Sequence, residues 1–594
     1  MFKPTNTLMS TALPADSVNI KGNKLPDKKR LIRRIKELYD ARREYEERWK
    51  EIRDYQLPFV GDFDNTADKT NPGRRRDLKI AHGVAWQACQ VFAAGIMSGL
   101  TPPSRQWFRF AYKRPELNMN VEAMKVLDQR QEIVQSVLAQ SNFYDSAHSS
   151  YMELPFGQSP IAVFYDPQNG IRFQHMSIGT YALGVDGYGK VNTFARKYEM
   201  TLRQIIDCFG VEHLPEQMKN FAENESQLSK KYTVCWLIEP NDDRLPDKID
   251  RLNMPYRSVY WLEKSQEDEF LYVGGFEEWP VPTARYLIIG NEAYGRGPGW
   301  FAEGDSKMLQ LLKKDYLTAV ELSIKPPMKG SAQLLNNGGI NLIPGGLTPV
   351  QDQVNQFVEP LFNVNLNLND AKEEIIRTED SIKRSYSADL FLMLDNLDNN
   401  RMTAREVMER TQEKLQQLGP VTERMQNEFL TLIINRVYNI IDRAGGFPPI
   451  PDELADVITE EDIQVDYISP LAQAQKMSGL VNIEQAIAFV GQMAQIWPEV
   501  TKKVDPLRTV GKYFENVGSP AVIQRSDEDA MEVLMQEQQE MARQQELQEG
   551  LAMAQAAAPA ADAAKNLTEA AQATTPALSS WLGVAGEFEE CIRR

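Results

Sequence analysis

The sequence contains few of the residues from which disulfide frameworks, metal sites and acid–base centres are usually built. Its 594 residues include four cysteines and four histidines, which are Cys89, Cys208, Cys235 and Cys591, and His82, His148, His175 and His213. The cysteines are too sparse for a disulfide framework and too far apart for a paired zinc site, which predicts a reduced, intracellular protein. The histidines show no metal-binding spacing, so we expect no metal, no cofactor and no histidine base.

Long hydrophobic runs and an excess of basic residues are also absent. The longest uncharged run lies between Lys79 and Arg105, but it includes polar residues and a Pro-Pro pair, which would be costly in hydrocarbon. We therefore expect a buried helix there rather than a membrane span, and a soluble protein without a secretory signal. Because 83 acidic residues outnumber 66 basic ones, for a net charge of −17, bulk attraction to DNA is excluded and any DNA contact must be local.

A basic stretch begins the first predicted helix. Seven Lys and Arg residues fall within positions 24–36, opposed only by Asp27, and apolar residues follow at spacings of three and four. This pattern predicts one long amphipathic helix from about Asp27 to Tyr55. Its basic start could contact nucleic acid or a scaffold, but a solvated helix end is the favoured interpretation.

Short β-type segments separated by turn residues occupy positions from about 152 to 281. The turns include residues 166–170 and 186–187, in which Asn, Asp and Gly suit tight hairpins. The predicted fold class is therefore mainly α with an inserted β-rich module (α+β).

A helix, a short tip and a returning helix are predicted in the middle of the chain. Asp305 is expected to cap a helix over residues 305–325, which a Pro-Pro pair ends. Residues 326–368 are rich in Gly and Asn with short apolar stretches, typical of a small β or irregular excursion. A second helix is then expected over residues 369–394.

Helices are predicted for most of the remaining chain. After a polar loop at residues 395–401, Thr403 and Glu406 form a capping box that starts a further helix. Ser469, followed by proline, is expected to restart helical structure. The acidic run at residues 459–462 lacks the ligand pattern of a calcium loop and is interpreted as a solvated helix start.

Two glycine-rich segments invite comparison with phosphate-binding loops. Residues 184–190 fit G-x-x-x-x-G-K, but Val191 replaces the required Ser or Thr, and a strand pattern follows where a phosphate cradle needs a helix. In residues 294–300, Pro298 has no N–H and the spacing departs from the dinucleotide fingerprint. We interpret the first segment as a hairpin turn and the second as a rigid connection. The sequence predicts no catalytic residue and no enzyme.

Six phrases resemble, in the same order, the portal proteins of short-tailed, podovirus-like bacteriophages, which connect head to tail. They are LTPPSRQWFRF (100–110), VDGYGKVNTFARKYEMTLRQIIDCFG (185–210), YGRGPGW (294–300), KPPMKG (325–330), MTAREVMER (402–410) and YISPLAQAQK (467–476). Each phrase alone is weakly specific, but six in order are hard to obtain by chance. The resemblance spans roughly residues 30–540.

The resemblance implies a portal fold of wing, stem, clip and crown regions that forms a dodecameric ring around an axial channel for double-stranded DNA. The predicted regions are a flexible N-terminal arm (1–26), a wing with the β-rich module (27–304), a stem helix (305–325), a clip (326–368), a second stem helix (369–394), a tunnel loop (395–401), a wing helix (402–449), a crown (450–525), a C-terminal crown or barrel helix (526–550) and a low-complexity, disordered tail (551–594).

The resemblance also implies partners and a place of action. The ring is expected at one capsid vertex of the virion, after assembly in the host cytoplasm, where it channels DNA during packaging and ejection. Expected partners are other copies of this chain, the major capsid protein, a scaffolding protein, the terminase large subunit, a tail adaptor protein and the DNA, with no membrane. Rival interpretations are a capsid scaffold or internal virion protein, favoured by the Gln- and Ala-rich C-terminus, and the packaging ATPase, favoured only by residues 184–190.

Charge predicts that any contact between the channel and DNA is loose. Each Lys or Arg on a phosphate adds salt-sensitive attraction, and a wall that gripped the duplex would stall translocation. The candidate channel residues are Asn396, Asp398, Asn399, Asn400 and Arg401 in the expected tunnel loop, and Lys313, Lys314, Lys325 and Lys329 in the expected stem and clip. Several of the lysines could instead form ion pairs between subunits, and the sequence leaves both interpretations open.

Overall fold

The computed structural model describes most of the chain between residues 25 and 504. The described residues are 25–63, 76–331 without 119–120, 167–169, 246, 249 and 267–268, then 343, 346–350, 359–361, 368–395, 418–450, 463–469, 486–504 without 495, 509–510, 531, 533, 535–537, 539–544 and 548. The chain divides into two units, Met1–Thr501 with Tyr513–Gly518, and Lys502–Lys512 with Ser519–Arg594. The fold described below belongs to the first unit.

Helices at both ends of the described residues enclose a stretch that is rich in strands. The helices are α1 (Lys28–Tyr55), α3 (Val84–Leu100), α4 (Pro115–Asn118), α5 (Val121–Gln140), α6 (Phe143–Glu153), the 3-10 helix η1 (Leu154–Phe156), α7 (Leu202–Phe209), α8 (Glu216–Ala222), α9 (Glu225–Leu228), α10 (Pro298–Phe301), α11 (Glu303–Ile324), α12 (Leu368–Ser385), α13 (Ala388–Asp395), the π-helix η2 (Gln426–Leu430), α15 (Thr431–Arg443) and the 3-10 helix η4 (Pro498–Lys503). The predicted α+β class is confirmed.

The first helix, α1, forms as its apolar spacing predicts. The Asp27 side chain caps it by accepting a hydrogen bond from the Lys29 N–H at 2.9 Å. Its basic start is not simply solvated, because Lys28 is buried and its Nζ donates a hydrogen bond to the Ser265 hydroxyl at 2.7 Å.

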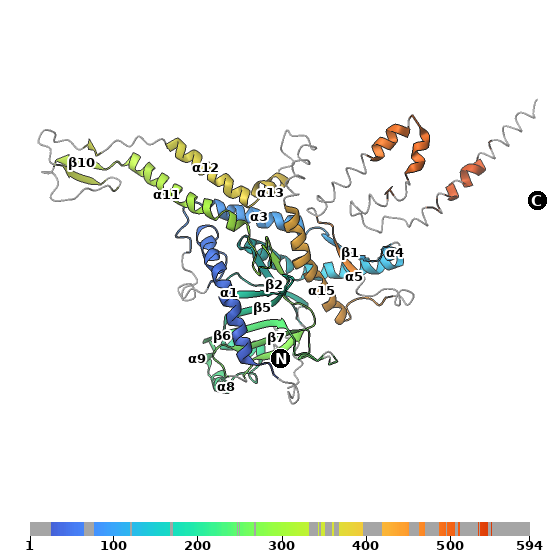
Figure 1. Cartoon of the computed structure of the whole chain (residues 1–594), viewed down its shortest axis with the longest axis horizontal. Helices are drawn as coiled ribbons and strands as arrows, with labels where there is room; N and C mark the ends of the chain where they lie inside the picture. The colour runs from blue at the N-terminus through green and yellow to red at the C-terminus, as the bar shows by residue number, and fades with distance from the viewer. Residues whose placement is uncertain are drawn as a thin grey trace, which may run out of the picture. The chain divides into compact units, whose positions relative to one another are not determined.

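Two antiparallel sheets form the β-rich part of the chain. The strands are β2 (Gln158–Asp166), β3 (Gly170–His175), β4 (Tyr181–Val185), β5 (Val191–Thr201), β6 (Lys231–Pro240), β7 (Tyr256–Leu262), β8 (Tyr272–Phe276) and β9 (Thr283–Arg285). One sheet has the order β4-β5-β6-β7-β8 and the other β3-β2-β9. Leu31 and Leu38 of α1 pack with Leu237 on one face of the larger sheet, and Figure 1 shows α1 running along it. Trp236 faces the other side, with its ring centroid 6.0 Å from that of Phe164 in β2.

Residues 184–190 form the end of a β-hairpin. The Asp186 carboxylate accepts hydrogen bonds from the N–H groups of Tyr188 and Lys190, both at 2.9 Å, and Gly189 has a φ of +80°. Strand β5 begins at Val191, so no helix N-terminus follows that could hold a phosphate. The predicted hairpin turn is confirmed.

The segment between β9 and α10 runs so close to the backbone of residues 154–157 that it requires glycine. A Cβ atom on Gly297 would lie 2.1 Å from the Leu154 carbonyl oxygen. The Arg296 N–H also donates a hydrogen bond to the Leu287 carbonyl at 2.7 Å, which closes the segment on itself. The predicted rigid connection is confirmed, and it fixes the start of α10 and α11 on the β-rich part.

The long uncharged run forms α3 in the protein interior. Cys89 and Phe92 are fully buried, and burial raises the pKa of the Cys89 thiol. Within the described ranges, no helix combines the length and the apolar run that a membrane crossing requires.

A strand follows the acidic run at residues 459–462, where the sequence predicts a helix. β13 (Ile463–Tyr467) pairs antiparallel with β1 (Phe108–Tyr112). The segment alternates apolar and polar residues, which suits a half-buried strand. The prediction is wrong because the partner strand lies far earlier in the chain, where local sequence gives no hint of it. The helix starts predicted at Thr403 and after Ser469 fall outside the described residues.

Candidate functional site

α11 and α12 lie side by side as an antiparallel hairpin with a small sheet at its end (Figure 1). The Asp305 carboxylate, near the start of α11, accepts a hydrogen bond from the Ser381 hydroxyl, near the end of α12, at 2.5 Å. Asp305 is not the predicted N-cap, because α11 begins at Glu303 and Ala302 occupies the cap position. α10 leads into α11 through Ala302, so Asp305 lies in the first turn of α11. The positive end of the helix dipole stabilises its negative charge there.

The returning helix is broken, whereas the sequence predicts one helix over residues 369–394. α12 ends at Ser385, Ser387 has a φ of +53°, and α13 then begins. Tyr386 at the break is fully buried, and its hydroxyl donates a hydrogen bond to the Gln56 side-chain oxygen at 2.6 Å. Burial raises the pKa of the Tyr386 hydroxyl well above its usual value. The anchoring of Tyr386 on Gln56, the residue that follows α1, turns the chain at a point where local helix propensity would continue it.

The tip of the hairpin is a three-stranded sheet, as the predicted β excursion allows. β10 (Met328–Ser331) lies between β11 (Leu347–Val350), to which it is parallel, and β12 (Glu359–Pro360), to which it is antiparallel. The Leu361 N–H donates a hydrogen bond to the Pro327 carbonyl at 2.7 Å, which joins the two ends of the excursion.

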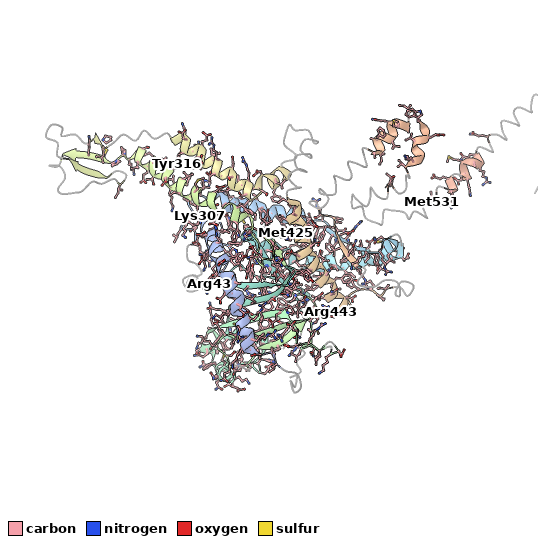
Figure 2. All side chains as sticks on the ribbon, in the orientation of Figure 1. Arg43, Lys307, Tyr316, Met425, Arg443 and Met531 are labelled. Atoms are coloured by element: carbon pink, nitrogen blue, oxygen red, sulfur yellow. The ribbon has the colours of Figure 1, made fainter. Side chains whose placement is uncertain are left out.

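Ion pairs fix the base of the hairpin to α1. Lys307 lies at the base of the hairpin (Figure 2). Its Nζ lies 2.8 Å from Glu51 and 2.6 Å from Glu303, and Arg48 lies 2.7 Å from Glu303. Burial lowers the pKa of Lys307, but the hydrogen bonds to the two carboxylates outweigh burial and raise it overall. The lysine therefore stays charged, and the hairpin projects from a fixed base.

Acidification should weaken the end of α1 beside this base. Asp54 lies 2.8 Å from both Lys79 and Arg53; burial raises its pKa, but these hydrogen bonds lower it below the usual value of 3.8. A depressed pKa adds stability that is present above the unfolded pKa and lost as pH falls through the folded one. We expect Asp54→Asn to lower the unfolding free energy at pH 7 by a few tenths of a kcal/mol to about 1 kcal/mol, because Lys79 is 52% exposed.

That difference between wild type and Asp54→Asn should be present at pH 7 and shrink toward pH 2, because the pH then falls through the depressed pKa of the folded Asp54 carboxylate and the wild-type group becomes protonated as well. Denaturant unfolding at both pH values measures the difference in unfolding free energy. The other carboxyl groups are the same in both proteins, so their contributions cancel in this difference. A difference that stays the same at both pH values contradicts the prediction.

The structure places all four candidate lysines on the hairpin or its tip. Lys313 is half-buried, with its Nζ 5.7 Å from the centre of the Tyr316 ring. Lys314 is exposed in α11, and Lys325 is exposed at the residue that directly follows α11. Lys329 lies in β10. The tunnel-loop candidates Asn396, Asp398, Asn399, Asn400 and Arg401 lie outside the described residues.

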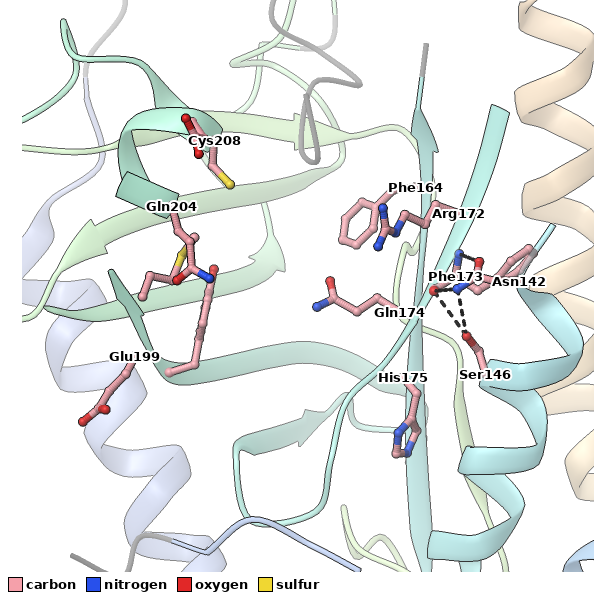
Figure 3. Close-up of a pocket in the computed structure, with 13 residues that line it drawn as sticks. Asn142, Ser146, Phe164, Arg172, Phe173, Gln174, His175, Glu199, Gln204 and Cys208 are labelled. Carbon is pink, nitrogen blue, oxygen red and sulfur yellow. Dashed lines mark hydrogen bonds between the residues drawn. The ribbon is translucent and has the colours of Figure 1, made fainter. Parts of the chain in front are cut away.

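A pocket of about 580 Å³ lies between β3, β5, α6 and α7 (Figure 3). Phe173 on its wall is held by Asn142, whose side chain donates to the Phe173 carbonyl at 2.7 Å and accepts from its N–H at 2.9 Å. Burial raises the pKa of the Cys208 thiol in this pocket to about 11, so the thiol stays protonated near neutral pH and is a poor nucleophile. The pocket therefore shows no sign of nucleophilic chemistry at its cysteine.

A Ser–His–Glu group that the sequence analysis missed lies beside this pocket. His175 Nε2 is 3.1 Å from the Ser159 hydroxyl and 3.3 Å from a Glu153 carboxylate oxygen. A catalytic triad needs the serine and the carboxylate on different ring nitrogens, whereas both meet the same nitrogen here. Glu153 also accepts hydrogen bonds from Ser177 and Ile178, so we interpret the group as a structural network. Among the described side chains, no group of three His, Cys, Asp or Glu could hold a metal ion.

Comparison with known proteins finds a matching family and two similar proteins. A family model described as "Bacteriophage head to tail connecting protein" matches residues 28–524. The chain is 33% identical to the portal protein of Salmonella phage epsilon15 over 565 residues, which are 94% of this chain and 99% of that protein. It is also 33% identical to the probable portal protein of Bordetella phage BPP-1 over 522 residues, 87% of this chain and 93% of that protein.

Proposed function

Because this chain belongs to the family of bacteriophage head to tail connecting proteins, we propose that it forms a dodecameric ring at one capsid vertex and conducts double-stranded DNA. The resemblance predicted from the six phrases is confirmed, and with it the role as a phage portal protein at the head–tail junction. The ring, the copy number and the channel belong to the proposal.

The observation that carries the proposal is the poorly covered outer half of the α11–α12 hairpin. From Leu311 to Ile324 no side chain of α11 is buried, and Leu317 and Ile324 are 52% and 71% exposed. Exposed apolar side chains on a projecting helix mark an interaction surface, and side-by-side copies in a ring would cover them. In this proposal residues 305–325 and 369–394 form the stem and residues 326–368 the clip. Residues 27–304 and 402–449 form the wing, residues 395–401 the tunnel loop and residues 450–525 the crown in this proposal.

The partners follow from the place of the ring. A head-to-tail connector contacts the capsid on one side and the tail on the other. We further propose the major capsid protein, a scaffolding protein, the terminase large subunit and a tail adaptor protein as the specific partners, and assembly in the host cytoplasm. The role is structural rather than catalytic in this proposal, because residues 184–190 form a hairpin turn and not a phosphate cradle.

Negative-stain imaging of the purified full-length chain tests the ring. We expect annular particles with a central pore, because each chain has exposed apolar surface on α11 that side-by-side copies would cover. Monomers or two-fold dimers under all solution conditions would contradict the proposal.

Added positive charge at the proposed tunnel loop should slow DNA movement. Replacing Asn399 and Asn400 with Lys adds two phosphate contacts per subunit, and each contact strengthens binding more at low salt. We expect packaging in a cell-free assay to slow several-fold at low salt, with recovery as salt is raised. The matched control is Gln217→Lys with Asn220→Lys on exposed positions of α8, which should package normally. Unchanged packaging at low salt would show that the loop does not approach DNA.

A further inference from the structure

Each helix of the α11–α12 hairpin has an exposed apolar side chain on its outer side. Leu311 of α11 is 60% exposed and Ile376 of α12 is 48% exposed, whereas Leu309 and Thr378 are buried. Two residues rotate a helix by about 200°, so Leu311 lies opposite Leu309, and Ile376 lies opposite Thr378. The two apolar side chains therefore lie on outer flanks of the hairpin, one formed by α11 and the other by α12.

The antiparallel register places these two side chains at the same height along the hairpin. The hydrogen bond between Asp305 and Ser381 fixes the register. Six residues onward from Asp305 is Leu311, and six residues back from Ser381 comes within one residue of Ile376. Because a helix rises about 1.5 Å per residue, Leu311 and Ile376 are level to within about 2 Å.

Charges one turn farther toward the tip are also level and have opposite signs. Lys314 follows Leu311 by three residues and is exposed, and no described residue forms an ion pair with it. Glu373 precedes Ile376 by three residues; its side chain is 64% exposed, and among the described residues it pairs with Arg377 on its own helix at 2.7 Å. Each flank thus presents one apolar residue and one charge, in matching positions.

We propose that Leu311 and Lys314 of one copy contact Ile376 and Glu373 of the next copy, an inference that rests on the proposed ring. A second copy of this chain fits each flank, because the chain itself carries both the α11 flank and the complementary α12 flank. A rotation about an axis parallel to the helices preserves height, so level residues meet. The two flanks differ, so the contact is heterologous, and repeating it gives the proposed ring when the rotation between neighbouring copies closes. Lys314 then belongs to the subunit interface rather than to the DNA channel.

Cysteine cross-linking tests the pairing in the assembled full-length protein. In a Cys591→Ser background, Leu311→Cys with Ile376→Cys should give a ladder of covalent oligomers under mild oxidation, since disulfides need Cα atoms within about 7 Å. Either single variant alone should give none, and a mixture of the two single variants should stop at dimers. The substituted positions are exposed, so imaging should still show rings.

Charge exchange provides a second, independent measurement. Lys314→Glu and Glu373→Lys should each reduce the assembled fraction about five-fold at low salt, and the double variant should recover it. The matched control is Lys36→Glu on an exposed position of α1, which should assemble like wild type. No recovery in the double variant would contradict the pairing.

The outcomes separate the pairing from the ring itself. Self-dimers of Leu311→Cys, or rings of the double-cysteine variant that do not cross-link, would overturn this inference and leave the ring intact. A wild-type chain that never forms rings would overturn both.

Discussion

Replacing Gly297 with alanine should strongly destabilise the folded protein. The added Cβ atom would lie 2.1 Å from the Leu154 carbonyl oxygen and 2.6 Å from that of Pro155, and both are backbone atoms that cannot rotate away. The φ of Gly297 is −96°, which alanine adopts readily, so crowding alone causes the effect. We expect a loss of at least about 3 kcal/mol in unfolding free energy, because the connection must separate from residues 154–155.

Gly304→Ala is the matched control, seven residues along the same segment. Its Cβ atom would meet nothing within 4 Å, and the residue lies in α11, where alanine is favoured over glycine by up to about 1 kcal/mol. Soluble yield and the denaturant midpoint measure both variants. A Gly297→Ala protein with the wild-type midpoint would show that the connection is looser than described.

Removing the Glu428 side chain should produce the second large loss of stability. The Arg285 side chain is only 2% exposed, and its Nε lies 2.7 Å from Glu428 in the π-helix. Its other nitrogens donate to the Gly189 and Glu292 carbonyls at 2.8 Å and 3.3 Å. Without Glu428, the buried guanidinium has lost its nearest negative charge. Glu428→Ala should cost about 2–4 kcal/mol, less than for a fully buried pair because Glu428 is 29% exposed.

Two comparisons isolate the ion pair from the loss of a helix residue. Glu423→Ala makes the same change at an exposed position of the same helical segment and should stay within about 0.5 kcal/mol of wild type. Arg285→Met combined with Glu428→Leu removes both charges and should recover part of the loss, since a buried pair is often replaceable by apolar residues. Thermal or denaturant unfolding measures all three, and equal effects of Glu428→Ala and Glu423→Ala would contradict the prediction.

Features set by neighbouring residues were predicted well from the sequence. The Asp27 cap and the apolar spacing predict α1, and the Asp-Gly turn predicts the hairpin between β4 and β5. The helix, tip and helix of the candidate stem follow from their composition. The four candidate lysines lie on or next to α11 and on β10, and their role stays a prediction, because it depends on what lies opposite in another copy, which one sequence does not reveal. The six phrases identified the family because their order is a property of the sequence itself.

The features that one sequence missed depend on residues distant in the chain. The break at Ser387 arises because Tyr386 is anchored on Gln56, and β13 is a strand because β1 supplies its hydrogen-bond partners. Local propensity amounts to less than about 1 kcal/mol per residue, so a buried tertiary contact overrides it.

The sequence by itself therefore determined the family, through the order of six phrases along the chain. It also determined the helix–tip–helix order and the positions of the turns, because each of these depends on residues within a few positions of one another. Only the tertiary structure decided where the helical segment after the tip breaks, at Ser387, and that β13 pairs with β1. It alone set the register that brings Leu311 level with Ile376, because a hydrogen bond between two different helices, Asp305 to Ser381, fixes that register.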